Sequence, residues 1–296
     1  MNNFDINRFG KTLRWVTSVN FRKMMLWFTG SVLAVFLGEV LTQFLNGHSA
    51  PYYAISTFSA FMALILTLVS MIMVSSVVSS INEKRKREAF LMLPATNLEK
   101  YLALVVYSTV ICIAVAILAI VLGDSLRMGW YWAIGYSGPE HATIITTEFG
   151  ETYYWWSSAI PMLIENLTPH LLSRSEVVPA DLMIVEMAFI IGGILWVHSL
   201  YTLGGTLLRK YSFVATTIFW IFCGTILVRI ILALDMTMFH SRWDNGELLE
   251  YEIGTISWIL AILFPILSVL NYWASFRIFK GFQLITNKWL NYDFHK

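Results

Sequence analysis

The sequence predicts an all-α membrane protein with six transmembrane helices and cytoplasmic N- and C-termini. It also predicts a short cytoplasmic helix between spans 2 and 3 and a small external segment between spans 3 and 4. Hydrophobic residues make up 57% of the 296 positions and charged residues only 13%, whereas soluble domains carry about 25% charged residues. The chain also contains six mostly apolar runs of the roughly 20 residues that a helix needs to cross a bilayer. We therefore expect one membrane domain.

The six predicted spans lie between a basic N-terminal segment and a basic C-terminal tail. Residues 1–22 mix apolar and basic positions at near-helical spacing, which predicts an amphipathic helix on the cytoplasmic membrane surface or, alternatively, a solvated basic tail. The second span is long, so we expect it to tilt or to extend into the cytoplasm. The predicted spans are residues 24–45, 53–80, 101–122, 182–203, 213–234 and 253–276.

Lysine and arginine predict the orientation, because they accumulate in cytoplasmic loops. They are concentrated in residues 1–22, in residues 82–100, at Arg209 and Lys210, and in the C-terminal tail, while the opposite loops hold mostly acids. Residues 123–181 are therefore expected outside, and this segment is too long for a simple connection. Its many aromatic residues indicate either a headgroup belt or a small external cap with an interfacial helix over residues 155–172, broken at Pro161.

Residues 82–100, NEKRKREAFLMLPATNLEK, are the most densely charged stretch of the chain. The basic block Lys84–Arg87 is followed by a short apolar patch and by Pro94, which disfavours a helical residue before it and so predicts a helix end near Leu93. Thr96 and Glu99 have the S/T-x-x-E spacing of a capping box, which predicts a new helix. A short charged helix, a turn and a capped restart together form a docking element for a cytoplasmic partner.

No pattern of catalytic or metal-binding residues is present. Gly10-Lys11-Thr12 resembles the end of a phosphate-binding loop, but Asp5 stands where that motif needs glycine and no strand precedes it. Cys112 and Cys223 lie in apolar runs and predict neither a disulfide nor a zinc site. We therefore expect no enzyme, no cofactor and no metal.

Four polar residues within the predicted spans are candidate functional residues: Glu39, Glu186, His198 and Arg229. Charged groups avoid lipid, so they are expected to face the bundle interior, an aqueous path or each other. Glu186 and Arg229 both lie near external span ends, where they would pair as a structural staple or line a polar path. Glu39 would snorkel or compete for the same arginine, and His198 is expected to be packed and hydrogen-bonded.

Three motifs, taken together with this topology, resemble the ABC-2-type transporter permeases. They are the loop sequence LMLPATNLEKY (residues 91–101), HSLYTLGGTLLRK (residues 198–210) and FQLITNKWLNYDF (residues 282–294). The resemblance implies the membrane subunit of an ATP-driven bacterial exporter in the cytoplasmic (inner) membrane, with residues 82–100 as its coupling helix and turn. The chain departs from the family in its short, acidic loop between spans 5 and 6 and in the bulky external segment after span 3.

The resemblance implies three partners: an ABC ATP-binding subunit, a second permease subunit in a homo- or heterodimer, and membrane lipid. No nucleic-acid partner is expected. The alternative is a non-transporting assembly or sensor protein whose basic loop binds another cytoplasmic protein; an intramembrane enzyme is less consistent with the sequence. The residues expected to dock the ATP-binding subunit are Lys84, Arg85, Lys86, Arg87, Phe90, Leu91, Pro94, Thr96 and Glu99.

Overall fold

The structure is a computed structural model that describes most of the chain. The described residues are 4–46, 51–81, 83–135, 142–144, 152–154, 156–167, 180–208, 210–234, 239–244 and 247–281. Among them, six helices are long and apolar enough to cross a membrane, over residues 6–38, 55–78, 97–133, 187–207, 212–233 and 255–280. The six predicted spans are therefore present as helices of membrane-spanning length and apolarity.

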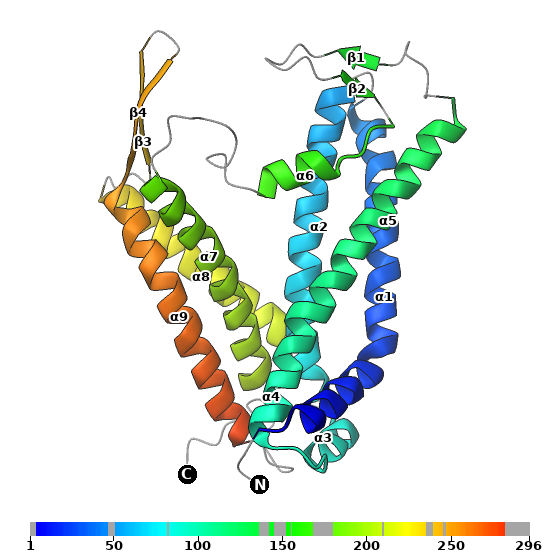
Figure 1. Cartoon of the computed structure of the whole chain (residues 1–296), viewed down its shortest axis with the longest axis vertical. Helices are drawn as coiled ribbons and strands as arrows, with labels where there is room; N and C mark the ends of the chain where they lie inside the picture. Colours follow the sequence, from blue (N-terminus) through cyan, green and yellow to red (C-terminus); the bar gives the residue numbers. More distant parts are fainter. Residues whose placement is uncertain are drawn as a thin grey trace. The chain divides into compact units, whose positions relative to one another are not determined.

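Figure 1 shows the elements, of which all the long ones are helices. The helices are α1 (Ile6–Asn46), α2 (Pro51–Ser80), α3 (Lys84–Leu91), α4 (Asn97–Val106), the π-helical turn η1 (Tyr107–Ile111), α5 (Cys112–Ala133), α6 (Ile160–Leu167), α7 (Ala180–Leu207), α8 (Ser212–Ala233) and α9 (Thr255–Lys280). Two short antiparallel hairpins, which the sequence did not predict, pair β1 (Ala142–Ile144) with β2 (Thr152–Tyr154) and β3 (Phe239–Asp244) with β4 (Glu247–Ile253).

The largest differences from the predicted boundaries are in the first and third spans. The N-terminal amphipathic segment and the first span form one continuous helix, α1. The third span does not end near Leu122: α4, η1 and α5 run on to Ala133. Asp124 and Arg127 belong to the segment predicted to be external, but in the structure they form an ion pair within the helix.

The chain divides into two compact units. The first contains Met1–Ser18, Met71–Ser108 and Leu171–Lys296, and the second contains Val19–Ser70 and Thr109–His170. The chain passes from one unit to the other within α1, within α2 and within the π-helical turn η1. Each unit has its own cluster of packed apolar side chains.

In the first unit, α7 packs against both α8 and α9. Phe264 of α9 lies at the centre of their contact, with the ring of Trp196 stacked on it at 5.0 Å between centroids. Small residues allow the helices to approach closely: a Cβ added to Gly192 would lie 2.9 Å from the Pro265 ring, and one added to Gly204 would collide with the Thr216 hydroxyl.

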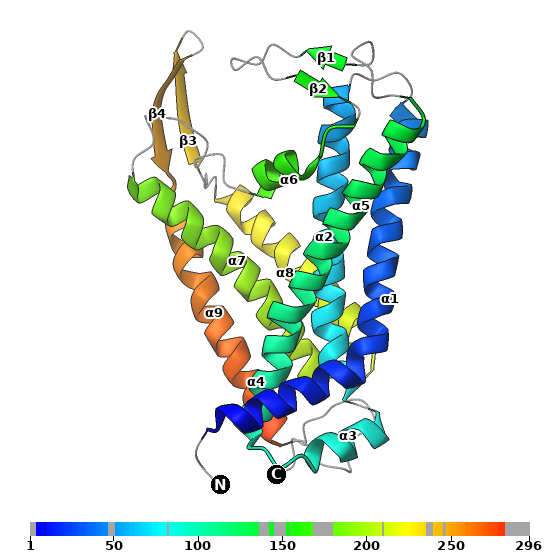
Figure 2. The same ribbon diagram turned by 45° about the vertical axis from the view of Figure 1, so that its right-hand side comes forward.

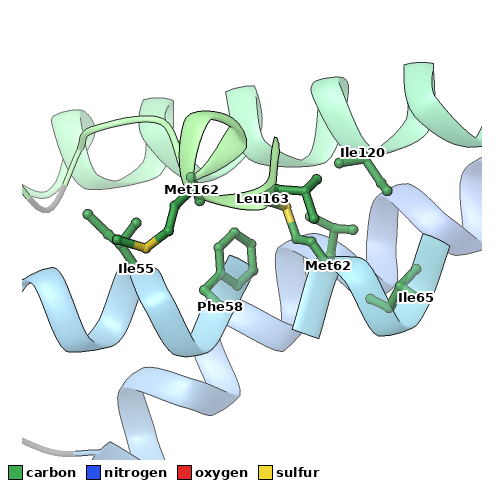
Figure 3. Close-up of a cluster of buried hydrophobic side chains, with 9 residues drawn as sticks. Ile55, Phe58, Met62, Ile65, Ile120, Met162 and Leu163 are labelled. Atoms are coloured by element: carbon green, nitrogen blue, oxygen red, sulfur yellow. The ribbon is translucent and has the colours of Figure 1, made fainter. Parts of the chain in front are cut away.

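In the second unit, α6 covers a cluster of apolar side chains from α2 and α5 (Figure 3). Met162 and Leu163 of α6 lie over Phe58 and Met62 of α2, and Ile120 of α5 completes the contact. One of the two interpretations of the external segment predicts a helix broken at Pro161, but Pro161 does not break α6. It lies in the first turn of α6, where the missing N–H of proline has no helical partner to lose.

Candidate functional site

The segment that joins α2 to α4 has the local structure that its sequence predicted. The basic block lies at the start of α3 (Lys84–Leu91), Met92 follows as its C-terminal cap, and Pro94 lies in the turn before α4. Lys86 pairs with Glu83 at 2.9 Å on the surface, and the side chain of Lys84 lies outside the described residues. We call residues 83–100 the α3–α4 loop.

The predicted capping box is confirmed at the start of α4. The Thr96 hydroxyl accepts a hydrogen bond from the Glu99 amide at 3.2 Å, and Glu99 Oε2 accepts one from the Thr96 amide at 2.8 Å. Thr96 has the extended backbone of an N-cap, with φ −68° and ψ 159°. Two otherwise unpaired helix-terminal N–H groups are thereby satisfied, which fixes the direction in which α4 leaves the turn.

Glu99 also binds the N-terminal segment, an interaction that the sequence did not predict. Its Oε1 atom accepts a hydrogen bond from the Asp5 amide at 2.8 Å and one from Arg8 Nη2 at 2.9 Å. Asp5 in turn accepts a hydrogen bond from the Asn7 amide at the start of α1. One fully buried carboxylate therefore joins the first turns of α1 and α4. The backbones of these two helix starts lie side by side in Figure 2.

Two cations of the α3–α4 loop are used inside the protein. Lys100 Nζ donates to the Leu91 carbonyl at 2.8 Å, and Arg87 Nε donates to the Ile81 carbonyl at 3.4 Å. Both acceptors are carbonyls at helix C-terminal ends, which lack helical partners and carry partial negative charge. Arg87 is 2% exposed, so it is not available to a partner, contrary to our prediction.

Phe90 is the second correction. We expected it to be an exposed anchor, but its side chain is fully buried. Its ring lies 5.6 Å from that of Trp15 in α1 and 6.0 Å from that of Phe279 in α9. Phe90 therefore holds α3 against the rest of the first unit, and its neighbour Leu91 is half-buried.

The exposed face of the α3–α4 loop is made by other residues. Arg85, Ala89 and Met92 follow one another at spacings of four and three, so they share one side of α3 opposite Arg87 and Phe90. Pro94, in the turn, and Leu98, in the first turn of α4, are also exposed. Met92 is 85% exposed and Leu98 43% exposed, although neither was among the predicted docking residues.

Tyr101, one residue after Lys100, connects the loop to α9. Its ring packs against Phe276 and Phe279, at 5.2 and 5.7 Å between centroids, and its hydroxyl donates to the Tyr272 carbonyl at 3.2 Å. The Tyr272 hydroxyl lies 2.5 Å from Nδ1 of His198 in α7. This confirms that His198 is packed and hydrogen-bonded, as predicted.

Further hydrogen bonds between side chains join α7 to α9. Thr206 bonds Ser275 at 3.1 Å, and Asn271 donates to Ser199 at 3.0 Å. Such bonds hold transmembrane helices together where apolar contact alone gives little preference over lipid. The loop is therefore linked through Tyr101 to a helix pair with a polar seam.

The predicted intramembrane charges have different outcomes. The side chains of Glu39 and Glu186 lie outside the described residues, while Arg229 is exposed on α8. The Glu186–Arg229 pair therefore stays a prediction.

A buried ion pair that the sequence did not predict joins Asp124 to Arg127, at 2.9 Å and with each side chain 1% exposed. Asp124 Oδ2 also accepts from the Ser158 hydroxyl at 2.6 Å, and Arg127 donates to the Ser157 carbonyl. Arg127 lies over the ring of Phe58 at 5.2 Å. These bonds hold the chain entering α6 against α5. The i, i+3 spacing of opposite charges was the signal in the sequence that could have revealed the pair.

No group of three or more potential metal ligands occurs among the residues that the structure describes. Comparison with protein-family models, with curated proteins and with solved structures finds no match to the chain.

Proposed function

We propose that the chain is the membrane-spanning permease subunit of an ABC-2-type exporter, driven by a separate ATP-binding subunit. The observation that carries the proposal is the construction of the α3–α4 loop. Phe90 and Glu99 fix the loop to α1 and α9, while Met92 and Leu98 remain exposed. An exposed apolar face on a firmly held loop is suited to receive force from a partner.

The corrected docking surface consists of Arg85, Ala89, Met92, Pro94 and Leu98. Met92 and Leu98 would supply the apolar anchors that carry most of the affinity at an interface. Arg85 would attract an acidic patch on the partner and speed the encounter. Lys86 has Glu83 beside it, so it would contribute less net charge to this surface.

The mechanism uses the contacts that hold the loop. When the ATP-binding subunits close on ATP, they would push the α3–α4 loop and, with it, the spans on either side of the loop, which would rock between inward- and outward-open states. Glu99 would pass the displacement to the start of α1, and Tyr101 would pass it to α9. Binding free energy at the exposed face would thus become a rearrangement of helices.

The test of the proposal has two parts. Membrane-impermeant labelling of single cysteines should place positions 86, 210 and 288 inside and positions 148 and 250 outside. The tagged chain, purified from its native host, should bring down a nucleotide-binding subunit whose ATP hydrolysis depends on the chain. An external position 86, or a purified chain with no associated ATPase activity, would contradict the proposal and favour the assembly or sensor alternative.

A further inference from the structure

One face of α9 is exposed along the whole helix and ends in two cations. Ile262, Ile266, Val269, Trp273, Arg277 and Lys280 are all exposed and fall on one side of the helix. The opposite side, which includes Leu260, Phe264 and Ser275, is buried within the first unit. The stripe therefore changes from apolar to aromatic to cationic in the direction of the C-terminal end of α9.

The length of α9 places each part of the stripe at the membrane depth where residues of that kind are favoured. A helix needs about 20 residues to cross the hydrocarbon, and α9 has 26, from Thr255 to Lys280. Twenty residues counted from Thr255 end at Ala274. Trp273 then lies at the boundary, where tryptophan accumulates, and Arg277 and Lys280 lie at the level of the headgroups.

Aromatic rings hold both cations in position. The Arg277 guanidinium lies 5.0 Å from the centroid of the Trp273 ring, which is itself 58% exposed. The Lys280 amine lies 5.7 Å from the centroid of Phe276, and Phe276 is packed against Tyr101. A cation over an aromatic face keeps its charge available while its stem covers apolar surface.

We propose that this stripe binds an anionic phospholipid, with its phosphate between Arg277 and Lys280 and its acyl chain along Ile262, Ile266 and Val269. The charge of the two cations selects an anionic headgroup over a zwitterionic one. The apolar stripe that leads up to them selects a lipid over a free phosphate. The proposal concerns α9 alone and does not depend on transport or on an ATP-binding subunit.

The test measures thermal unfolding of the purified full chain in detergent during titration with defined lipids. Phosphatidylglycerol should raise the unfolding midpoint more than phosphatidylcholine does, and glycerol 3-phosphate should leave the midpoint unchanged. Each cation near an anionic group contributes about a fivefold change in affinity. The Arg277→Gln/Lys280→Gln variant should therefore need roughly 25-fold more phosphatidylglycerol to reach half of the maximal rise in the unfolding midpoint.

Two matched variants make the result specific. Lys210→Gln removes an exposed cation that lies between α7 and α8 rather than on α9, and should keep the phosphatidylglycerol effect. Trp273→Leu keeps the stripe apolar but removes the ring under Arg277, and should lose part of the effect. An unchanged phosphatidylglycerol titration in the Arg277/Lys280 double variant would overturn the proposal. The proposal would also be overturned if the double variant changed the dimer fraction or the binding of the ATPase instead of the lipid titration. The stripe would then be a protein interface.

Discussion

Glu99 Oε1 lies 2.9 Å from Arg8 Nη2, although the two residues are 91 positions apart in the chain. The same carboxylate closes the capping box of α4 through Oε2. Glu99 therefore has a local role that its spacing to Thr96 predicts and a long-range role that only the folded structure shows. Its carboxylate binds both the turn before α4 and the start of α1.

We predict that Glu99→Gln destabilises the protein more than Thr96→Ala does. Loss of the Thr96 cap should cost about 0.5–2 kcal/mol. Glu99→Gln weakens three hydrogen bonds to a buried carboxylate, and hydrogen bonds to charged groups are worth about 1.5–3 kcal/mol each before relaxation. Thermal or chemical unfolding in detergent measures both changes.

The control for this comparison is Lys86→Gln, which removes the surface pair with Glu83 and should change the free energy of unfolding by less than about 1 kcal/mol. If Glu99→Gln is as mild as Lys86→Gln, the carboxylate does not tie α1 to α4.

Phe90→Ala should destabilise the protein strongly because its ring is buried between Trp15 and Phe279. Truncation of a buried phenylalanine typically costs about 3–5 kcal/mol. Met92→Ala, two residues away on the exposed face, should change stability by less than about 0.5 kcal/mol. Equal unfolding midpoints for these two variants would contradict the assignment of the two faces of α3.

The difference between Phe90 and Met92 shows how far the sequence could predict the site. Pro94 and the Thr96–Glu99 spacing act over three or four residues, so the helix end and the capped restart could be predicted. The rotation of α3 could not, because it is set by Trp15 and Phe279, which are distant in sequence. Helical spacing puts Arg85, Ala89 and Met92 on one face of the helix and residues 87 and 90 on the other. It does not tell which of the two faces is buried.

The six spans could be predicted from the apolar runs of the sequence, but the end of the third could not. A hydropathy scale scores each charged residue by itself and therefore assigns Asp124 and Arg127 to a loop. In the structure they satisfy each other and also bind Ser157 and Ser158, so the helix continues past them. The difference at Pro161 has a similar origin, since proline ends a helix when it lies in the interior but is well tolerated in the first turn.

Arg127→Met should destabilise the second unit by about 3–5 kcal/mol, because it leaves the buried Asp124 carboxylate without its cation. Adding Asp124→Asn to Arg127→Met should recover part of this loss, so the double variant should lose less stability than the two single variants summed. Ser125→Ala, on an exposed position of the same helix, is the control and should be nearly neutral. Purely additive losses would show that the two charges do not interact.

Gly204→Ala should destabilise the contact of α7 with α8, because the new Cβ collides with the Thr216 hydroxyl. Overpacking of this kind costs about 1–3 kcal/mol. Thr216→Ala in the same chain should restore part of the loss by removing the hydroxyl. Gly224→Ala on α8 adds a methyl group where there is open space and should be neutral or stabilising by up to about 1 kcal/mol. Similar losses for Gly204→Ala and Gly224→Ala would contradict close packing at Gly204.

We propose that the exposed face of the α3–α4 loop binds an ATP-binding subunit, and the double variant Met92→Ser/Leu98→Ser removes the two large apolar side chains of that face. The measurement is the amount of ATPase retained by the purified chain, together with the hydrolysis rate of the complex. We predict a loss of at least about tenfold in retained ATPase, since two apolar anchors that each contribute about 1 kcal/mol or more are removed. The unfolding midpoint should be unchanged.

The matched control for that measurement is Leu234→Ser, which alters an equally exposed leucine just beyond the C-terminal end of α8 and should leave ATPase retention intact. If the Met92/Leu98 variant retains the ATPase as well as the Leu234 variant does, while both are folded, the α3–α4 loop is not the docking site.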